Sequence, residues 1–225
     1  MEYTNTLNIL PLLAAWLIDD DYDGYKNKAI SATGLLKPTR EIILKRRLAE
    51  GTVTQLGQPV LPVPLDISTL LRPRLGQCVH SALENLWQSG RGVELLKQIN
   101  PDKAEVYAGL AINPDYEIDP RKALYIERRV VKEILPDIYI QGKYDIIDQG
   151  VLNDYKTGLT FLDKKDKFEE YQKQASIYRL LEPDKIVEDY AFFHEIYMDW
   201  SPKLAQIRTD YPAAPIGVKE IPLLS

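Results

Sequence analysis

The pattern of apolar residues changes near Pro120, and this change restricts the fold more than any other feature of the chain. The segments 123–135 and 137–147 are rich in Val, Ile and Tyr with partial alternation, which is typical of strands. Gln149-Gly150 indicates a turn before a third strand over 151–156. Because the connections are short, the three strands are expected to form an antiparallel meander.

A helix and a further strand are predicted after the meander. The segment 164–181 has helical spacing, and 189–199 alternates again, with Phe192, His194 and Ile196 on one side. Helices followed by a meander, a helix and a returning strand predict a mixed α/β fold.

The first 110 residues favour helices. Helical spacing or boundary signals occur in the segments 8–18, 41–48, 75–87 and 93–99. We expect Asn8 to cap the first of these helices. Three prolines between 57 and 64 predict a loop or an extended arm. We therefore expect one domain over residues 1–225, with a helical N-terminal part (1–110) and an α/β core (120–200).

Composition excludes several classes of protein. Cys78 is the single cysteine, so the chain can form neither an intrachain disulfide nor a cluster held by four thiolates. The formal net charge of −5 argues against a uniformly basic protein but leaves room for a local basic groove. The apolar stretch 7–18 contains Pro11 and follows no Lys or Arg, which fits neither a signal peptide nor a membrane-spanning helix. We expect a cytoplasmic protein with no membrane partner.

Charged residues on two neighbouring predicted strands point to a chemistry. Asp145 and Asp154 come together if the strands pair through the turn at Gly150, and Lys156 lies on the same face as Asp154. Two close carboxylates repel unless they share a proton or bind a hard cation such as Mg²⁺. A lysine beside such a cation can orient a water for phosphodiester hydrolysis. Surface ion pairs produce the same triplet, so it does not decide the function alone.

Four motifs in order resemble the RecB-type branch of the PD-(D/E)xK nuclease superfamily. They lie between residues 75 and 200 and are Gly76-x-x-x-His80, Gly142-x-x-Asp145, Asp154-Tyr155-Lys156-Thr157-Gly158 and Gln174-x-x-x-Tyr178. The resemblance implies a restriction-endonuclease-like core. Some members of the branch hold an iron–sulfur cluster with four cysteines, and this chain is similar to the members without one, such as small phage or bacterial exonucleases.

The resemblance also implies a metal site for Mg²⁺ or Mn²⁺. Its ligands would be Asp145, Asp154, the backbone carbonyl of Tyr155 and His80. Glu127 matches a position where some relatives have an acidic residue near a second metal. Without the motif, a lone histidine beside an apolar stripe is more often a packed residue than a ligand.

The remaining implied roles concern the reaction. Lys156 would position the attacking water beside Asp145 and Asp154, and Gln174 and Tyr178 would hold the site or the nucleic-acid backbone. The two helix residues could equally be core-edge residues. His194 has no motif to support it, and we predict a buried structural histidine there.

The function implied is a metal-dependent DNA nuclease, an exonuclease acting on DNA ends in processing, recombination or repair. Recombination or replication proteins would be its partners, and a phage-encoded copy would act in the bacterial cytoplasm. The basic residues 45–47 and 128–129 are candidate phosphate contacts. One alternative is a non-catalytic nucleic-acid-binding or assembly module that keeps the fold, and another is a structural protein whose motif match is coincidence.

Overall fold

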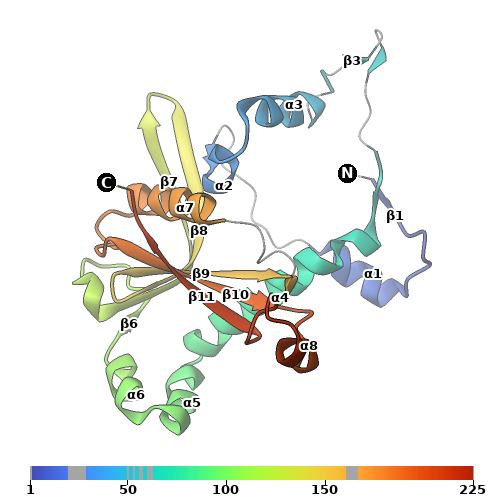
Figure 1. Cartoon of the computed structure of the whole chain (residues 1–225). Coiled ribbons are helices and arrows are strands. Elements are labelled where there is room, and N and C mark those ends of the chain that lie inside the picture. The colour runs from blue at the N-terminus through green and yellow to red at the C-terminus, as the bar shows by residue number, and fades with distance from the viewer. Residues whose placement is uncertain are drawn as a thin grey trace.

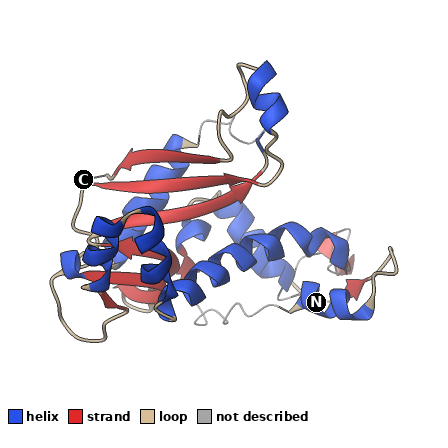
Figure 2. Ribbon diagram, turned by 90° about the horizontal axis from the view of Figure 1, so that it is seen from below, coloured by secondary structure: helices blue, strands red, loops and turns tan. Residues whose placement is uncertain are grey.

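The computed structural model describes residues 2–19, 29–49, 51–52, 54–55, 58–59, 63–160 and 167–224 (Figure 1). The described residues form a mixed α/β fold around a seven-stranded sheet with helices on both faces (Figures 1 and 2). No helix in these segments combines the length and the apolar character needed to span a bilayer.

The sheet contains the predicted meander. Six of its seven strands lie in the order β11 (Ile216–Pro222), β10 (Tyr190–Tyr197), β9 (Val151–Gly158), β8 (Ile138–Asp148), β7 (Ala123–Leu135) and β6 (Ala111–Ile112), and the seventh, β2 (Ala29–Ser31), pairs with β8 off this path. β7, β8 and β9 are antiparallel, as expected from their short connections, and β10 returns parallel to β9. β11 pairs antiparallel with β10 at one edge, and β6 pairs parallel with β7 at the other.

Helices cover the two faces of the sheet with different parts of the chain. One face packs against α7 (Phe168–Leu181) and the short α2 (Ala32–Leu35), and the other against α4 (Leu71–Gln88) and α6 (Pro101–Ala108), while α5 (Arg91–Ile99) packs against α4 and α6 (Figure 1). The α7 face holds the larger apolar core, in which Tyr171 stacks on Phe193 with ring centroids 4.3 Å apart. On the α4 face, Trp87 and Tyr107 pack against Ile126 and Ile146.

A portion of the N-terminal part extends away from the sheet (Figure 1). It contains β1 (Tyr3–Thr4), α1 (Pro11–Ile18), α3 (Thr39–Ala49), β3 (Thr54–Gln55), β4 (Gln58–Pro59), β5 (Leu65–Asp66) and a 3₁₀ turn, Ile67–Leu70. β1 pairs parallel with β5, and β3 pairs with β4. Two short elements flank the main strands in the chain: a 3₁₀ turn, Pro120–Lys122, precedes β7, and α8 (Pro202–Ile207) lies between β10 and β11.

Two expectations for the N-terminal part need correction, and a third is tested only in part. Asn8 does not cap α1: its φ is +51°, and the helix begins at Pro11, whose missing N–H suits a first helical position. Region 1–110 is not wholly helical, because β2 (Ala29–Ser31) pairs parallel with β8 and joins the main sheet. Of the predicted loop or extended arm over 57–64, residues 57 and 60–62 lie outside the described residues, and Gln58–Pro59 is extended, as a short strand.

Candidate metal centre

One pocket of about 570 Å³ brings the motif residues together. It lies between α2, α4 and α7 and the strands β7, β8 and β9. The residues named from the sequence that line it are His80, Glu127, Arg129, Gly142, Asp145, Asp154, Tyr155, Lys156, Gln174 and Tyr178. Residues up to 147 positions apart in the chain, from Ser31 to Tyr178, therefore share one cavity.

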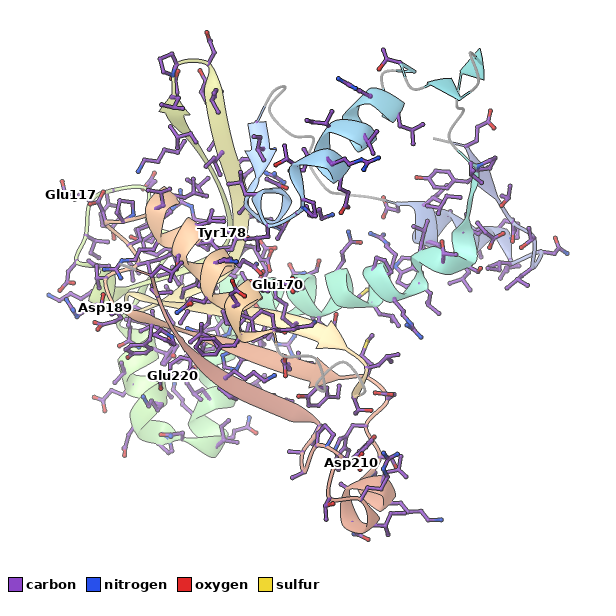
Figure 3. All side chains as sticks on the ribbon, turned by 45° about the horizontal axis from the view of Figure 1, so that its top comes forward. Glu117, Glu170, Tyr178, Asp189, Asp210 and Glu220 are labelled. Carbon is purple, nitrogen blue, oxygen red and sulfur yellow. The ribbon has the colours of Figure 1, made fainter. Side chains whose placement is uncertain are left out.

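Two motif glycines allow the helices to approach the sheet. A Cβ atom on Gly142 would lie 2.5 Å from Cε1 of Tyr178, far inside van der Waals contact. Tyr178, marked on α7 in Figure 3, donates its O–H to the carbonyl of Lys143 at 2.8 Å. A Cβ on Gly76 would lie 2.9 Å from Oγ1 of Thr157 in β9. Gly76 thus lets α4 cross β9 closely, with His80 one turn further along the helix.

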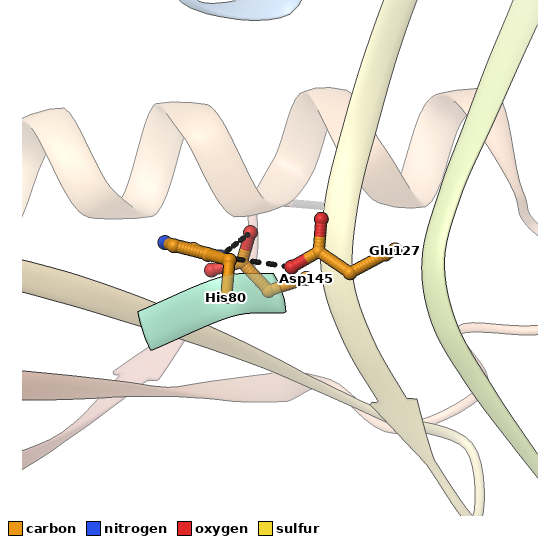
Figure 4. Close-up of side chains that lie close together, drawn as sticks. All are labelled: His80, Glu127 and Asp145. Atoms are coloured by element: carbon orange, nitrogen blue, oxygen red, sulfur yellow. Dashed lines mark hydrogen bonds and ion pairs between the residues drawn. The ribbon is translucent and has the colours of Figure 1, made fainter. Parts of the chain in front are cut away.

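His80, Glu127 and Asp145 form a cluster of possible metal ligands (Figure 4). One ligand atom of each lies within 4.8 Å of the other two. Nδ1 of His80 is 2.9 Å from Oε1 of Glu127 and 3.3 Å from Oδ1 of Asp145. Burial lowers the pKa of His80, but the hydrogen bonds to Asp145 and Glu127 outweigh it and raise the pKa to about 10. Without a cation, an imidazolium therefore neutralises the carboxylates.

The backbone at Glu127 is unusual for a strand. Its φ is +51°, a left-handed conformation that non-glycine residues rarely adopt. The alternation of faces also breaks in the facing strand β8, because Tyr144 packs in the α7 core whereas Ile146 packs in the α4 cluster. At this irregularity the carboxylates of Glu127 and Asp145 both contact Nδ1 of His80 in α4.

Asp154 lies beside this cluster and is held by other partners. Its Oδ2 is 2.6 Å from Nζ of Lys156, and its Oδ1 accepts a hydrogen bond from Nε2 of Gln174 at 3.1 Å. Burial and the neighbouring Asp145 raise the pKa of Asp154, while Lys156 lowers it. For Lys156, the carboxylates of Asp154 and Asp145 outweigh the effect of burial and raise its pKa. The lysine is therefore an ammonium at neutral pH.

The cluster differs from the ligand set that the resemblance implies. His80 and Asp145 are in both, but Glu127 stands in the cluster where Asp154 was expected. The backbone of Tyr155 contacts Asp145 through its N–H, which donates to Oδ2 at 2.7 Å. Ligand roles for Asp154 and for the Tyr155 carbonyl stay predictions.

Several pocket residues were not identified from the sequence. Lys143 lies inside the Gly142-x-x-Asp145 motif, and its Nζ is 2.8 Å from Oε2 of Glu127. Arg74, Gln77 and Glu84 also line the pocket from α4. Their helical spacing with His80 is the signal that could have found them. Ser31, Ala32 and Thr33 line the pocket from β2 and α2, and no pattern marks them.

The other candidate positions have mixed outcomes. Of the basic pair 128–129, Arg129 lines the pocket, whereas Arg128 lies over the ring of Tyr125 and donates to the carbonyl of Pro114. The side chains of residues 45 and 46 lie outside the described part of the chain. His194 is half-buried rather than buried, and its Nε2 is 2.9 Å from Oδ1 of Asn153.

Comparison with known proteins finds a similar fold but no relative that indicates a function. No family model and no curated protein matches the chain. The crystal structure of SSO0001 superimposes with a TM-score of 0.50 at 18% identity, covering 95% of this chain and 76% of that chain. This similarity concerns the fold alone.

Proposed function

We propose that this chain is a divalent-metal-dependent nuclease built on a restriction-endonuclease-like core. The observation that carries the proposal is the His80–Glu127–Asp145 cluster in one pocket with the Lys156–Asp154 pair. A meander, a covering helix and a parallel returning strand hold these residues, in agreement with the order of elements that the motifs imply. We further propose that DNA with free ends is the substrate.

The residues of the cluster fit Mg²⁺ or Mn²⁺. Two carboxylates supply oxygen ligands, which both ions prefer, and the imidazole of His80 adds a nitrogen that suits a transition-metal ion. The protonated imidazole that bridges Glu127 and Asp145 stands where a cation would neutralise the same two charges. When bound, the metal would supply Lewis-acid chemistry, polarising the phosphate and easing deprotonation of water.

Lys156 supplies a positive charge and donates hydrogen bonds, and it does not act as a base. Its ammonium lies against Asp154 and 5.7 Å from the ring centroid of Phe193, and Asp154 and Asp145 raise its pKa. A protonated amine can hold a water by its oxygen and stabilise the negative charge that builds on a phosphate under attack.

Gln174 and Tyr178 act as positioning residues. Gln174 donates to Asp154, and Tyr178 donates to the carbonyl of Lys143, so both use their polar groups on the protein. Of the two roles that the resemblance implies for them, these contacts favour holding the site over holding the nucleic-acid backbone.

The test is cleavage of end-labelled linear DNA and closed circular DNA, in Mg²⁺, Mn²⁺ and EDTA. Asp145→Asn and Lys156→Gln are compared with the wild type and with Lys97→Gln, a control at an exposed ion pair with Glu94. We expect loss of linear DNA in metal, none in EDTA, and at least a hundredfold slower cleavage by both site variants.

Other results would change the proposal in defined ways. Cutting of the circle would make the protein an endonuclease. No cleavage in either metal by a folded protein that binds DNA would overturn the nuclease and favour the non-catalytic module.

A further inference from the structure

Two basic side chains from neighbouring strands line the pocket beside the metal cluster. Arg129 of β7 and Lys143 of β8 are paired across the antiparallel ladder, and both line the pocket. Directly paired residues in such a ladder have Cβ atoms about 4.5–5.5 Å apart. The guanidinium and the ammonium can therefore contact the same anion.

Lys143 is linked to the cluster through a single carboxylate. Oε1 of Glu127 contacts His80, and its Oε2 lies 2.8 Å from Nζ of Lys143. The Lys143 side chain keeps 36% of its surface exposed, compared with 6% for Glu127. Its backbone is fixed by the O–H of Tyr178, so the exposed ammonium end is the part that can turn toward the pocket.

The charges of the pocket favour binding of an anion once a divalent cation occupies the metal cluster. Arg74, Arg129, Lys143 and Lys156 balance the lining acids Glu84, Glu127, Asp145 and Asp154. Neutralisation of Glu127 by a divalent cation would weaken its hold on Lys143 and leave the lining with excess positive charge. A tetrahedral oxyanion suits this arrangement, because arginine binds phosphate through paired N–H groups and lysine as a point charge.

We propose that Arg129 and Lys143 form a phosphate-binding subsite that takes the nucleic-acid phosphate next to the one that is cleaved. This inference rests on the proposed nuclease function for the identity of its ligand. It assigns substrate contacts to two residues that are not among the catalytic and metal-binding residues implied by the resemblance. Their role is to hold the strand in register while the adjacent phosphate lies at the metal cluster.

The subsite is tested by binding, without cleavage. Thymidine 5′-phosphate is titrated by calorimetry into the Mn²⁺-loaded wild type, Lys143→Gln, Arg129→Gln, Lys143→Arg and the control Lys97→Gln. We expect about tenfold weaker binding for each neutral variant, recovery in Lys143→Arg, and no change in the control. Mn²⁺ affinity, measured first, shows that each variant is folded. The Mn²⁺ affinity of Lys143→Gln should equal or exceed that of the wild type, because the Lys143 ammonium no longer competes with the metal for Glu127.

The outcomes separate this inference from the nuclease proposal. Equal affinity of wild type and both neutral variants for thymidine 5′-phosphate would overturn the subsite, as would no binding to the Mn²⁺-loaded wild type. Charge-dependent binding by a protein that cleaves no nucleic acid would keep the subsite and overturn the nuclease. Full cleavage with unchanged KM in both neutral variants would support the nuclease and overturn the subsite.

Discussion

Glu127 combines a functional side chain with an unfavourable backbone. Its φ of +51° costs a non-glycine residue on the order of 1 kcal/mol. Glu127→Ala and Glu127→Gly both remove the carboxylate, but only glycine relieves the backbone. We predict that the glycine variant is the more stable of the two by about 1 kcal/mol in urea unfolding.

A matched pair at Glu220 provides the control for this prediction. Glu220 is an exposed residue of the edge strand β11 and has no positive φ. There glycine should be less stable than alanine by about 0.5–1 kcal/mol. The same order of stabilities at both positions would contradict a strained Glu127.

The proton on His80 makes metal binding depend on pH. Because its pKa is about 10, the imidazole is protonated at neutral pH, and a cation at Nδ1 must displace that proton. We predict that Mn²⁺ affinity rises by up to about tenfold per unit between pH 6 and 8.5. Calorimetry in buffers of different ionisation enthalpy would measure the released proton. His80→Asn should bind Mn²⁺ more weakly and with a smaller slope, and an equal slope would refute the assignment.

At the scale of elements, Gly142 and Tyr178 form one packing unit between β8 and α7. Gly142→Ala would bring a methyl group to about 2.5 Å from the Tyr178 ring. We predict a loss of about 1–3 kcal/mol, as for other overpacked sites, measured by urea unfolding. Tyr178→Leu removes the ring, so Gly142→Ala should cost less in that background. Additive effects of the two substitutions would show that they do not touch.

The elements that sequence patterns predicted are those with strong local signals. The meander was found because β7, β8 and β9 are long, rich in β-branched residues and joined by recognisable turns. β2 and β6 have three and two residues, too few for a period, and depend on distant partners. Four of the motif residues were expected to bind metal. Glu127, which lies in the observed cluster, has a left-handed backbone that the alternation of residues in the sequence does not reveal.

At the scale of the molecule, a buried carboxylate joins three elements. Glu195 of β10 accepts hydrogen bonds from Tyr171 of α7 and Tyr197, and lies 2.9 Å from Nζ of Lys219 in β11. Burial raises its pKa, but Lys219, Tyr171 and Tyr197 outweigh burial and lower it. This stabilisation is therefore present above about pH 4.5 and is lost as the pH falls through the lowered pKa.

Glu195→Gln tests the contribution of this carboxylate. We predict a loss of about 1–3 kcal/mol at pH 7, because the amide cannot replace the buried negative charge that pairs with the partly exposed Lys219. Urea unfolding between pH 3 and 7 should show the difference from the wild type shrinking at the acid end. The exposed Glu220→Gln provides the control, and a constant difference would contradict the pKa direction.

Metal binding should stabilise the whole fold, because the cluster joins α4 to the sheet. Mn²⁺ at a hundred times its dissociation constant adds about 2.7 kcal/mol to the free energy of unfolding. We predict a corresponding rise in melting temperature that EDTA reverses and Asp145→Asn abolishes. An equal rise in Asp145→Asn would place the ion elsewhere.

The short strand β2 gives the pocket a wall with its own stability. β2 pairs with β8 through the three described positions Ala29–Ser31, and the residues that follow, Ala32 and Thr33, line the pocket, whereas the metal cluster lies on β7, β8 and α4. A strand held by three paired positions has a lower free energy of local opening than a strand at the centre of a sheet. Backbone amides of β2 should thus exchange with solvent much faster than those of β8 around Asp145. One side of the pocket can then open and admit a polymer while the ligands stay in place.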